Sequence, residues 1–283
     1  MTIGEALAAG AARLQAAGIR EARRDADLLL RHVTGATRAW VIAHPEAEMA
    51  SEQAKIFADL ISRREEHEPV QYITGVQEFF GREFEVSPAV LIPRPETEIA
   101  VEAAVEHLSA LGNPKFVELG IGSGCISISI LAEVASARGI GVDLSPQALP
   151  VAERNAAKHN VAARLDLRRS DLFSAVDETG LDAVVSNPPY VPDDVIATLE
   201  PEVNEYEPRL ALAGGSEGLD VVRRIIAGSP GRLRPGGLLV IEIGIGQSFD
   251  VENMFDPESW TEAAVIPDLQ GIPRTLRAIF RGR

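Results

Sequence analysis

The sequence lacks several features that define particular classes of protein. Its 283 residues contain one cysteine, Cys125. One cysteine excludes an internal disulfide and a cysteine-based zinc site, and it is typical of a protein in a reducing cytoplasm. No stretch approaches the roughly 20 apolar residues that span a membrane. Residues 1–18 include Glu5 and Arg13 and lack the continuous apolar segment of a signal peptide. We therefore expect a cytoplasmic protein without a membrane partner.

Basic residues are also scarce. The chain has 27 Lys and Arg against 42 Asp and Glu, a net charge of −15. A nucleic-acid enzyme usually presents a basic stripe to the phosphates. The nearest candidates, Arg20, Arg23, Arg24 and the pair Arg63–Arg64, are interleaved with acids, which is typical of solvated helix faces. We expect no direct contact with nucleic acid. The five histidines show no metal-ligand spacing, so no metal site is expected either.

The pattern of apolar residues divides the chain into three parts. Residues 1–68 have leucines and isoleucines at helical spacing, with helix stops at Gly18 and Gly35, and predict a helical domain. Residues 69–98 are rich in aromatic and β-branched residues, Tyr72 and Ile73 among them, and glycines punctuate them. This pattern predicts a β-hairpin linker.

Residues 99–283 alternate between strand and helix patterns. After a helix over residues 97–111, strands are expected at 116–119, 140–142, 165–167, 183–185, 238–243, 263–266 and 276–280. Strands that alternate with helices form a mostly parallel sheet covered on both faces. The predicted fold class is therefore α/β, with an N-terminal helical bundle.

A glycine-rich loop follows the first strand of this α/β part, in the order Gly120-Ile121-Gly122-Ser123-Gly124. Glycine lets the backbone turn sharply and lets a ligand approach where a Cβ would clash. Cys125 stands where a dinucleotide fingerprint has its third glycine, which disfavours a nicotinamide- or flavin-dependent oxidoreductase. As a small residue opening a helix, Cys125 is expected to be structural and not a catalytic thiol.

Acidic residues follow the next two strands. Asp143 can accept hydrogen bonds from both ribose hydroxyls of a nucleoside, and Asp171 can accept from an adenine amino group. The alternatives are a helix-capping or turn aspartate for Asp143 and a simple turn residue for Asp171. Together with the glycine loop, the two acids predict a nucleoside-bearing ligand at the carboxyl edge of an open sheet.

The tetrad Asn187-Pro188-Pro189-Tyr190 follows the fourth strand directly and carries the strongest signal in the chain. Its prolines fix the backbone, so the Asn187 side chain and the Pro188 carbonyl are held rigidly. Two such acceptors can hold both N–H bonds of a planar amide and aim its nitrogen at a methyl donor. Tyr190 offers a face for the planar group. A strand-ending turn is the alternative, and the glycine loop before the tetrad argues against it.

These residues resemble the class I S-adenosylmethionine-dependent methyltransferases, and within them the release-factor glutamine N5-methyltransferases. The most specific part of the resemblance is the run Ile92-Pro93-Arg94-Pro95-Glu96-Thr97-Glu98. The resemblance spans nearly the whole chain and also includes residues 69–75, 79–81, 207–212, 214–220 and 233–237.

The resemblance implies a Rossmann-like seven-stranded methyltransferase domain over residues 99–283. A substrate-recognition bundle over residues 1–68 would be joined to it by the hairpin linker 69–98. The implied activity is transfer of a methyl group from S-adenosyl-L-methionine to the glutamine of the Gly-Gly-Gln motif in peptide chain release factors. We expect the enzyme to be a monomer.

The resemblance also implies a role for each motif residue. Gly120, Ile121, Gly122, Ser123, Gly124, Asp143, Asp171 and Asn187 would hold the cofactor. Relatives often place an aromatic residue where Leu172 stands, so Leu172 or Phe173 would lie beside the adenine. Asn187, Pro188, Pro189, Tyr190, Arg94 and Glu96 would bind the substrate, with Asn187, Pro188 and Tyr190 catalytic. Arg94 to Thr97 would line the site and shape it. Glu118 and Glu242 would either assist cofactor binding or cap the sheet edge.

Three other functions share some of these features. Glutamine methylation of a ribosomal protein uses the same tetrad, and the sequence does not separate it from release-factor methylation. A DNA adenine or rRNA guanine amino-methyltransferase would need a basic docking surface, which the charge of −15 disfavours. A cofactor-binding scaffold without activity would be expected to lose the tetrad first, and the tetrad is intact.

Overall fold

The computed structural model describes residues 1–282 and divides into two compact units. The first unit contains residues 1–76 together with 200–206, and the second contains 77–199 and the chain from Glu207 onward. The chain therefore passes between the units three times. None of the helices described is long and apolar enough to cross a membrane.

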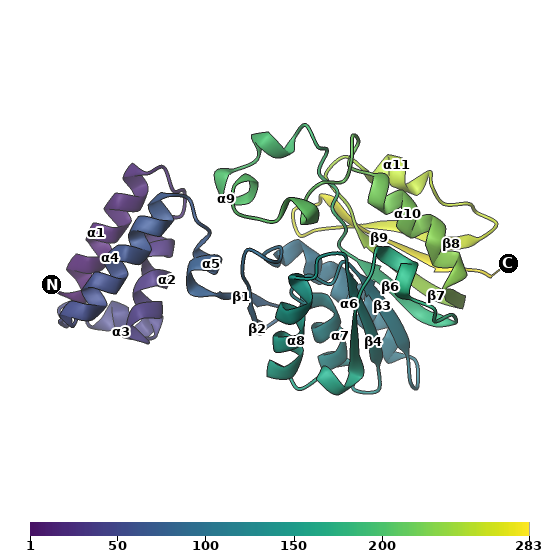
Figure 1. Ribbon diagram of the computed structural model, residues 1–283, viewed down its shortest axis with the longest axis horizontal. Helices are drawn as coiled ribbons and strands as arrows, with labels where there is room; N and C mark the ends of the chain where they lie inside the picture. The colour runs from purple at the N-terminus through teal and green to yellow at the C-terminus, as the bar shows by residue number, and fades with distance from the viewer. Residues whose placement is uncertain (283) are drawn as a thin grey trace. The chain divides into compact units, whose positions relative to one another are not determined.

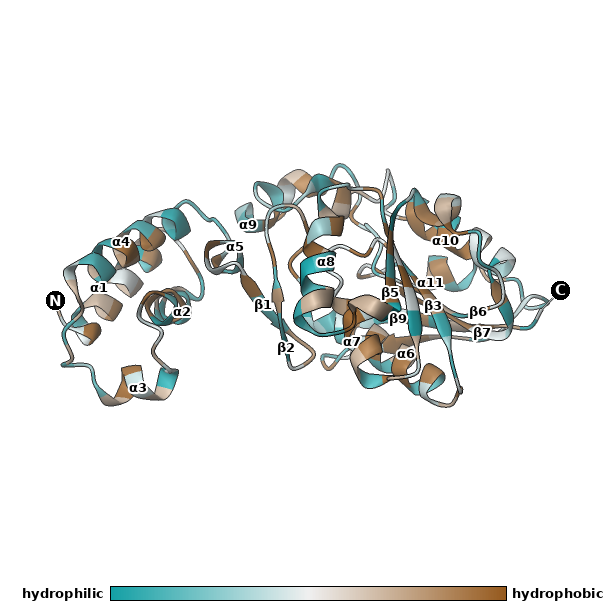
Figure 2. Ribbon diagram, turned by 60° about the horizontal axis from the view of Figure 1, so that its bottom comes forward, coloured by the Kyte–Doolittle hydropathy of each residue, from teal (hydrophilic) through white to brown (hydrophobic). Residues whose placement is uncertain are grey.

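The first unit is a helical bundle, as predicted. Its helices in residues 1–76 are α1 (Ile3–Ala16), α2 (Ala22–Thr34), α3 (Arg38–Ala43), α4 (Ser51–Glu65) and α5 (Val70–Thr74). Hydrophobic and hydrophilic stretches alternate along α1 and α4 (Figure 2), and the apolar side chains, Leu14, Leu30 and Ile61 among them, form one core. The predicted stops are confirmed, because Gly18 and Gly35 follow α1 and α2 with positive φ.

Residues 200–206 join the bundle although they follow the fourth strand of the large sheet in sequence. They include the short helix α9 (Pro201–Asn204). The buried guanidinium of Arg64 in α4 donates to Asp25 at 2.8 Å and also to Glu202. The Tyr206 hydroxyl donates to the Glu66 carbonyl at 2.6 Å. A buried arginine needs such partners because an unpaired charge is costly to bury.

A two-stranded hairpin is formed by β1 (Val76–Phe79) and β2 (Arg82–Glu85). The two turn residues, Phe80 and Gly81, both have positive φ, as a type I′ turn requires. The hairpin is thus confirmed, but the prediction that Tyr72 and Ile73 belong to it is wrong. Both lie in α5, which ends at Gly75, because burying their side chains outweighs their preference for strands.

The second unit is built on a seven-stranded sheet in the order β5-β4-β3-β6-β7-β9-β8. All seven predicted strands are present: β3 (Lys115–Leu119), β4 (Arg138–Asp143), β5 (Leu165–Arg169), β6 (Leu181–Ser186), β7 (Leu233–Glu242), β8 (Trp260–Pro267) and β9 (Pro273–Phe280). The first five pair in parallel, and β9 is antiparallel to β7 and β8. The predicted α/β fold class is therefore confirmed.

Helices cover both faces of this sheet (Figure 1). Along β3, Phe116 faces a core that includes residues of α6 (Glu98–Ser109), α7 (Cys125–Glu133) and α8 (Ala148–Lys158). The next residue, Val117, faces a second core with α10 (Asp220–Gly228) and α11 (Ser248–Glu252). The strand order reverses between β3 and β6, and in such sheets ligands bind at the carboxyl ends of the strands beside the reversal.

Candidate active site

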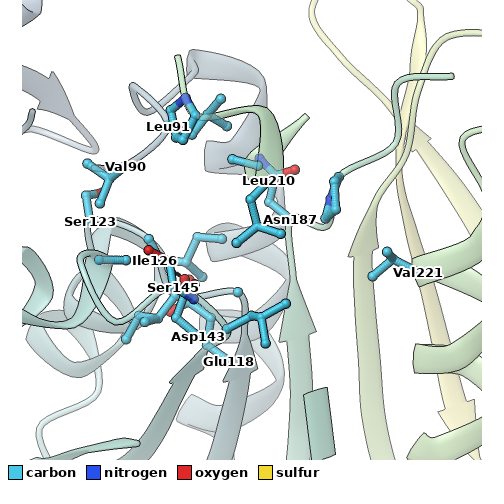
Figure 3. Close-up of a pocket in the computed structure, with 18 of the residues that line it drawn as sticks. Val90, Leu91, Glu118, Ser123, Ile126, Asp143, Ser145, Asn187, Leu210 and Val221 are labelled. Atoms are coloured by element: carbon cyan, nitrogen blue, oxygen red, sulfur yellow. Dashed lines mark hydrogen bonds between the residues drawn. The ribbon is translucent and has the colours of Figure 1, made fainter. Parts of the chain in front are cut away.

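A cavity lies at the carboxyl edge of the sheet, where the loops after β3, β4, β5 and β6 meet (Figure 3). It encloses about 1170 Å³ counting its open mouth, and all of its lining residues belong to the second unit. Nine predicted site residues line it: Gly120, Ile121, Gly122, Ser123, Asp143, Asp171, Leu172, Asn187 and Pro189. Six others do not: Gly124, Phe173, Pro188, Tyr190, Arg94 and Glu96.

The three glycines of the loop after β3 have positive φ but different surroundings. At Gly122 no atom lies within 4 Å of where a Cβ would stand, and at Gly120 only the Asn187 carbonyl oxygen does, at 3.9 Å. These two glycines keep the floor of the cavity open. At Gly124 a Cβ would stand 2.8 Å from Ile128 Cδ1 and 3.4 Å from Ala152. Gly124 is therefore needed for close packing of α7 against α8.

Asp143, the last residue of β4, joins the glycine loop to the next turn. Its Oδ2 accepts from the Gly122 amide at 2.9 Å, and its Oδ1 accepts from the Ser145 amide at 2.8 Å. Burial raises the pKa of this carboxyl, and the backbone donors partly offset the rise. Each carboxylate oxygen has a further lone pair, so Asp143 can still accept from two hydroxyls in the cavity.

Glu118 is a buried carboxyl at the end of β3, and it also lines the cavity. Its Oε2 accepts from the Ser127 amide at 2.8 Å. Burial raises the pKa of Glu118 to about 8, with Asp143 adding to the rise. Burial likewise raises the pKa of Cys125, which lines the same cavity. Near pH 7 both groups are mainly neutral, so Cys125 is not an activated thiolate.

The residues after β5 divide between the cavity and the core. Asp171 lines the cavity, and its carboxylate accepts from Arg224 at 2.8 Å. Leu172 also lines the cavity, with a φ of 48° that is unusual for leucine. The Phe173 ring packs against Gly228 in the second core. Between the two residues considered for the adenine position, the structure thus places Leu172 at the cavity.

The tetrad residue Asn187 reaches the cavity from the end of β6, opposite Asp143 (Figure 3). The neighbouring Ser186 hydroxyl donates to the Leu119 carbonyl at 2.7 Å and fixes this strand end to β3. Val142 and Ser186 both pair with Leu119. Asp143 and Asn187 are the next residues along the chain after Val142 and Ser186, so they lie at the same height on either side of β3. Two strand spacings place their backbones roughly 10 Å apart.

Polar groups behind the cavity hold the tetrad in place. The Asn187 amide nitrogen donates to Thr97 Oγ1 at 3.1 Å, and the Tyr190 hydroxyl donates to Glu242 at 3.0 Å. Burial and the Glu242 carboxylate raise the pKa of Tyr190. Burial raises the pKa of Glu242, while its bonds from Thr97 and Tyr190 oppose the rise. The Glu242 side chain does not line the cavity, which favours a structural role over a role in cofactor binding.

A second loop, residues 212–218, clamps the tetrad from the other side. Val191 donates to the Leu212 carbonyl and accepts from the Gly214 amide, both at 2.9 Å. A Cβ on Gly214 would stand 2.8 Å from the Pro189 carbonyl oxygen, and one on Gly218 would stand 2.2 Å from that of Tyr190. The Gln247 side chain donates to the Tyr190 carbonyl at 3.0 Å. This packing explains why glycines recur in residues 214–218.

The run that contains Arg94 and Glu96 supports the cavity wall. Arg94 donates to the buried carboxylate of Glu207 at 2.5 Å. Pro208, which follows Glu207, lines the cavity together with Pro93 and Thr97. Glu96 lies in the short 3-10 helix Pro95–Thr97, and its charge helps to raise the pKa of Glu242. Arg94 and Glu96 thus stand behind lining residues.

Comparisons with known proteins agree with this site. The family model described as PrmC N-terminal domain matches residues 5–75, and the one described as Methyltransferase small domain matches residues 93–199. The release factor glutamine methyltransferase of Cereibacter sphaeroides is 44% identical over 98% of this chain and 98% of its own length. That of Moorella thermoacetica is 40% identical over 99% of both chains. The chain belongs to the release factor glutamine methyltransferase family.

A solved structure adds evidence on the fold alone. A methyltransferase from Pyrococcus furiosus, 18% identical, covers 72% of this chain and 91% of its own, with a TM-score of 0.53. The present chain has the seven-stranded sheet that the family resemblance implies, and its fold is similar to that of a solved methyltransferase.

The residues at the cavity fit the cofactor of the family, S-adenosylmethionine. Gly120 and Gly122 leave an open floor, and Asp143 keeps acceptor capacity for a pair of ribose hydroxyls. The apolar side chains of Ile121 and Leu172 offer walls for a flat ring. Ligand sites of this size are mainly apolar with a few converging polar groups, as here.

The sequence prediction missed three residues that organise the site of this methyltransferase. Thr97 was expected to line the site, but not to hold Asn187. Asn155, buried in α8, donates to the Ser123 carbonyl and to the Glu85 carbonyl, both at 2.9 Å, and so joins the glycine loop to the hairpin. Gln247 holds Tyr190. A buried polar residue within a helical apolar pattern was the only available signal, and it applies to Asn155 alone.

Proposed function

We propose that this methyltransferase transfers a methyl group from S-adenosylmethionine to the side-chain amide nitrogen of the glutamine in the Gly-Gly-Gln motif of peptide chain release factors. The observation that carries the proposal is the carboxamide of Asn187 at the cavity, opposite Asp143. The full-length relatives named for this activity support the choice of substrate.

The chemistry requires a poor nucleophile to be positioned well. An amide nitrogen shares its lone pair with the carbonyl group, so it reacts only when it is aligned with the methyl carbon. We assign Asn187 Oδ1 as the acceptor for one N–H bond of the substrate amide. The Pro188 carbonyl is the predicted acceptor for the other, although Pro188 does not line the cavity. The cofactor, when bound, supplies an electrophilic methyl group on a sulfonium.

No strong base is needed for the proton that leaves. As the new N–C bond forms, the amide nitrogen becomes acidic, and a hydrogen-bonded oxygen can hold its proton until water takes it. Glu242 is not placed for this role, because its side chain does not line the cavity. The side chains at the site therefore act by orientation, and Asp143 acts on the cofactor.

In this proposal the helical domain binds the protein substrate and has no part in binding the cofactor. All residues that line the cavity belong to the second unit, so residues 1–68 are not required for binding the cofactor. We propose that residues 1–68 recognise the release factor, that the linker is 69–98 and the catalytic domain 99–283, and that the reaction takes place in the cytoplasm, where release factors act.

The test is a labelling experiment with purified components. The protein and methyl-labelled S-adenosylmethionine are incubated separately with a release factor, with ribosomal proteins and with ribosomal RNA, and the label is located by mass spectrometry. We expect the label on the glutamine of Gly-Gly-Gln and none on a release factor with that glutamine changed to alanine. Label on a ribosomal protein or on RNA instead would contradict the proposal.

Asn187→Ala provides the second part of the test. We expect turnover to fall by about 10²-fold or more, because the acceptor for the substrate amide is lost. Cofactor affinity, measured by calorimetry, should stay nearly unchanged because the Asp143 side of the cavity is intact. Equal turnover in wild type and variant would contradict the role of Asn187.

A further inference from the structure

A chain of buried hydrogen bonds runs from Asn187 into the core. Asn187 Nδ2 donates to Thr97 Oγ1 at 3.1 Å, and Thr97 Oγ1 donates to Glu242 Oε2 at 2.5 Å. The other oxygen of Glu242 accepts from the Tyr190 hydroxyl at 3.0 Å. Thr97 and Glu242 are each 1% exposed, so water does not compete for these bonds.

With Glu242 as a carboxylate, the direction of each bond follows from the number of protons available. A threonine hydroxyl has one proton, and here that proton is used on Glu242. Towards Asn187 the Thr97 oxygen can therefore only accept, and only the NH2 end of the Asn187 amide can face it. If the amide were reversed, Asn187 Oδ1 would face Thr97 Oγ1 with no proton between the two oxygens. The chain of bonds thus selects one of the two orientations of the Asn187 amide.

This selection matters because the two orientations have opposite chemistry. With Nδ2 turned to Thr97, Asn187 Oδ1 is left to accept from a ligand in the cavity. With the amide reversed, Asn187 would present an NH2 group to the NH2 group of the substrate glutamine. Only the first orientation can hold the nucleophile.

We propose that Thr97 and Glu242 are positioning residues that fix the Asn187 carboxamide with its oxygen towards the substrate amide. The inference rests on the proposed function for the identity of the substrate. It assigns a positioning role to the run Ile92–Glu98, because this run supplies the hydroxyl that links Asn187 to Glu242 at the end of β7.

The test compares Thr97→Val with Thr97→Ser. Valine keeps the shape of threonine but lacks the hydroxyl, and we expect turnover to fall about tenfold or more, as the loss of one buried hydrogen bond predicts. Cofactor affinity should change by less than about twofold. Serine restores the hydroxyl and should restore most of the turnover. Thr97→Ala gives the same test if the valine variant is too unstable to purify.

Thr275→Val is the matched control. Thr275 is equally buried and pairs with Glu242 across β7 and β9, but its hydroxyl has no hydrogen-bond partner within residues 1–282. The same chemical change there should leave turnover close to that of wild type. Equal losses in Thr97→Val and Thr275→Val would overturn the proposal, because they would reflect general packing.

Two further measurements isolate the link to Asn187. In an Asn187→Ala background, Thr97→Val should cause little additional loss, because its effect passes through Asn187; a full additional loss would overturn the proposal. In ¹⁵N-edited NMR spectra, the Asn187 side-chain NH2 protons should exchange slowly in wild type and rapidly in Thr97→Val. The NMR result does not depend on substrate, so it tests the positioning role even if the glutamine is not the methylated group.

Discussion

Glu118 gives the sharpest prediction, because its burial ties the stability of the second unit to pH. The carboxyl is 1% exposed, and its pKa is raised from 4.5 to about 8. A carboxyl whose pKa is higher in the folded than in the unfolded state stabilises the fold while it is protonated. That contribution is fully present below pH 4.5 and is lost as pH rises through about 8.

The magnitude follows from the same values. At about 1.36 kcal/mol for each pH unit between the two pKa values, the contribution of Glu118 to the free energy of unfolding should fall by about 3.5 kcal/mol between pH 5 and pH 8. Glu118→Gln cannot ionise but can still accept from the Ser127 amide. The stability of the variant should therefore lack the Glu118 part of the pH dependence, and the difference between variant and wild type should grow with pH.

The assay must report on the second unit alone. The chain has two tryptophans, of which Trp260 is buried in the second unit and Trp40 lies in the first. In a Trp40→Phe background, urea unfolding followed by fluorescence therefore reports Trp260. A difference between wild type and Glu118→Gln that stays constant from pH 5 to pH 8 would refute the assignment of a neutral buried carboxyl.

Two further variants test the cofactor side and the substrate side of the cavity separately. Asp143→Ala should weaken binding of S-adenosylhomocysteine by roughly 10²-fold, because acceptors for two hydroxyls are lost; calorimetry measures this, and unchanged affinity would count against the ribose role. Gly214→Ala should lower turnover about tenfold or more with cofactor affinity retained, because the added Cβ would stand 2.8 Å from the Pro189 carbonyl oxygen and displace the tetrad. Gly231→Ala, where no atom lies within 4 Å of the new Cβ, is its control and should behave as wild type.

Much of the fold could be predicted because short patterns of apolar residues determine most of its helices and strands. The seven strands of the large sheet were found from short apolar segments between helical patterns, and the hairpin from glycine and aromatic residues. The helix α5 was missed because Tyr72 and Ile73 favour strands. Their burial in the first unit, which no local pattern reveals, decides the conformation.

The site residues that could be predicted are those whose position is set by the strand that they follow. The glycines after β3 and the acid at the end of β4 are placed by the sheet itself, so their meeting at one edge followed from the strand order. The link between Thr97 and Glu242 joins residues 145 apart in sequence and depends on packing between distant elements. The choice between Leu172 and Phe173 likewise depends on the room beside Gly228.

The three passages of the chain between the units affect how the protein can be divided. A cut after Val76 severs only one of the connections, because residues 200–206 remain part of the catalytic fragment. That fragment still carries Glu202 and Tyr206, the partners of Arg64 and Glu66 in the bundle. A shortened protein that begins at residue 77 would keep residues 200–206 but lack the helices that they contact. A bundle expressed without residues 200–206 would lose Glu202 and leave the buried Arg64 paired with Asp25. The two units are thus not consecutive segments of the sequence, and neither can be separated from the other by a single cut.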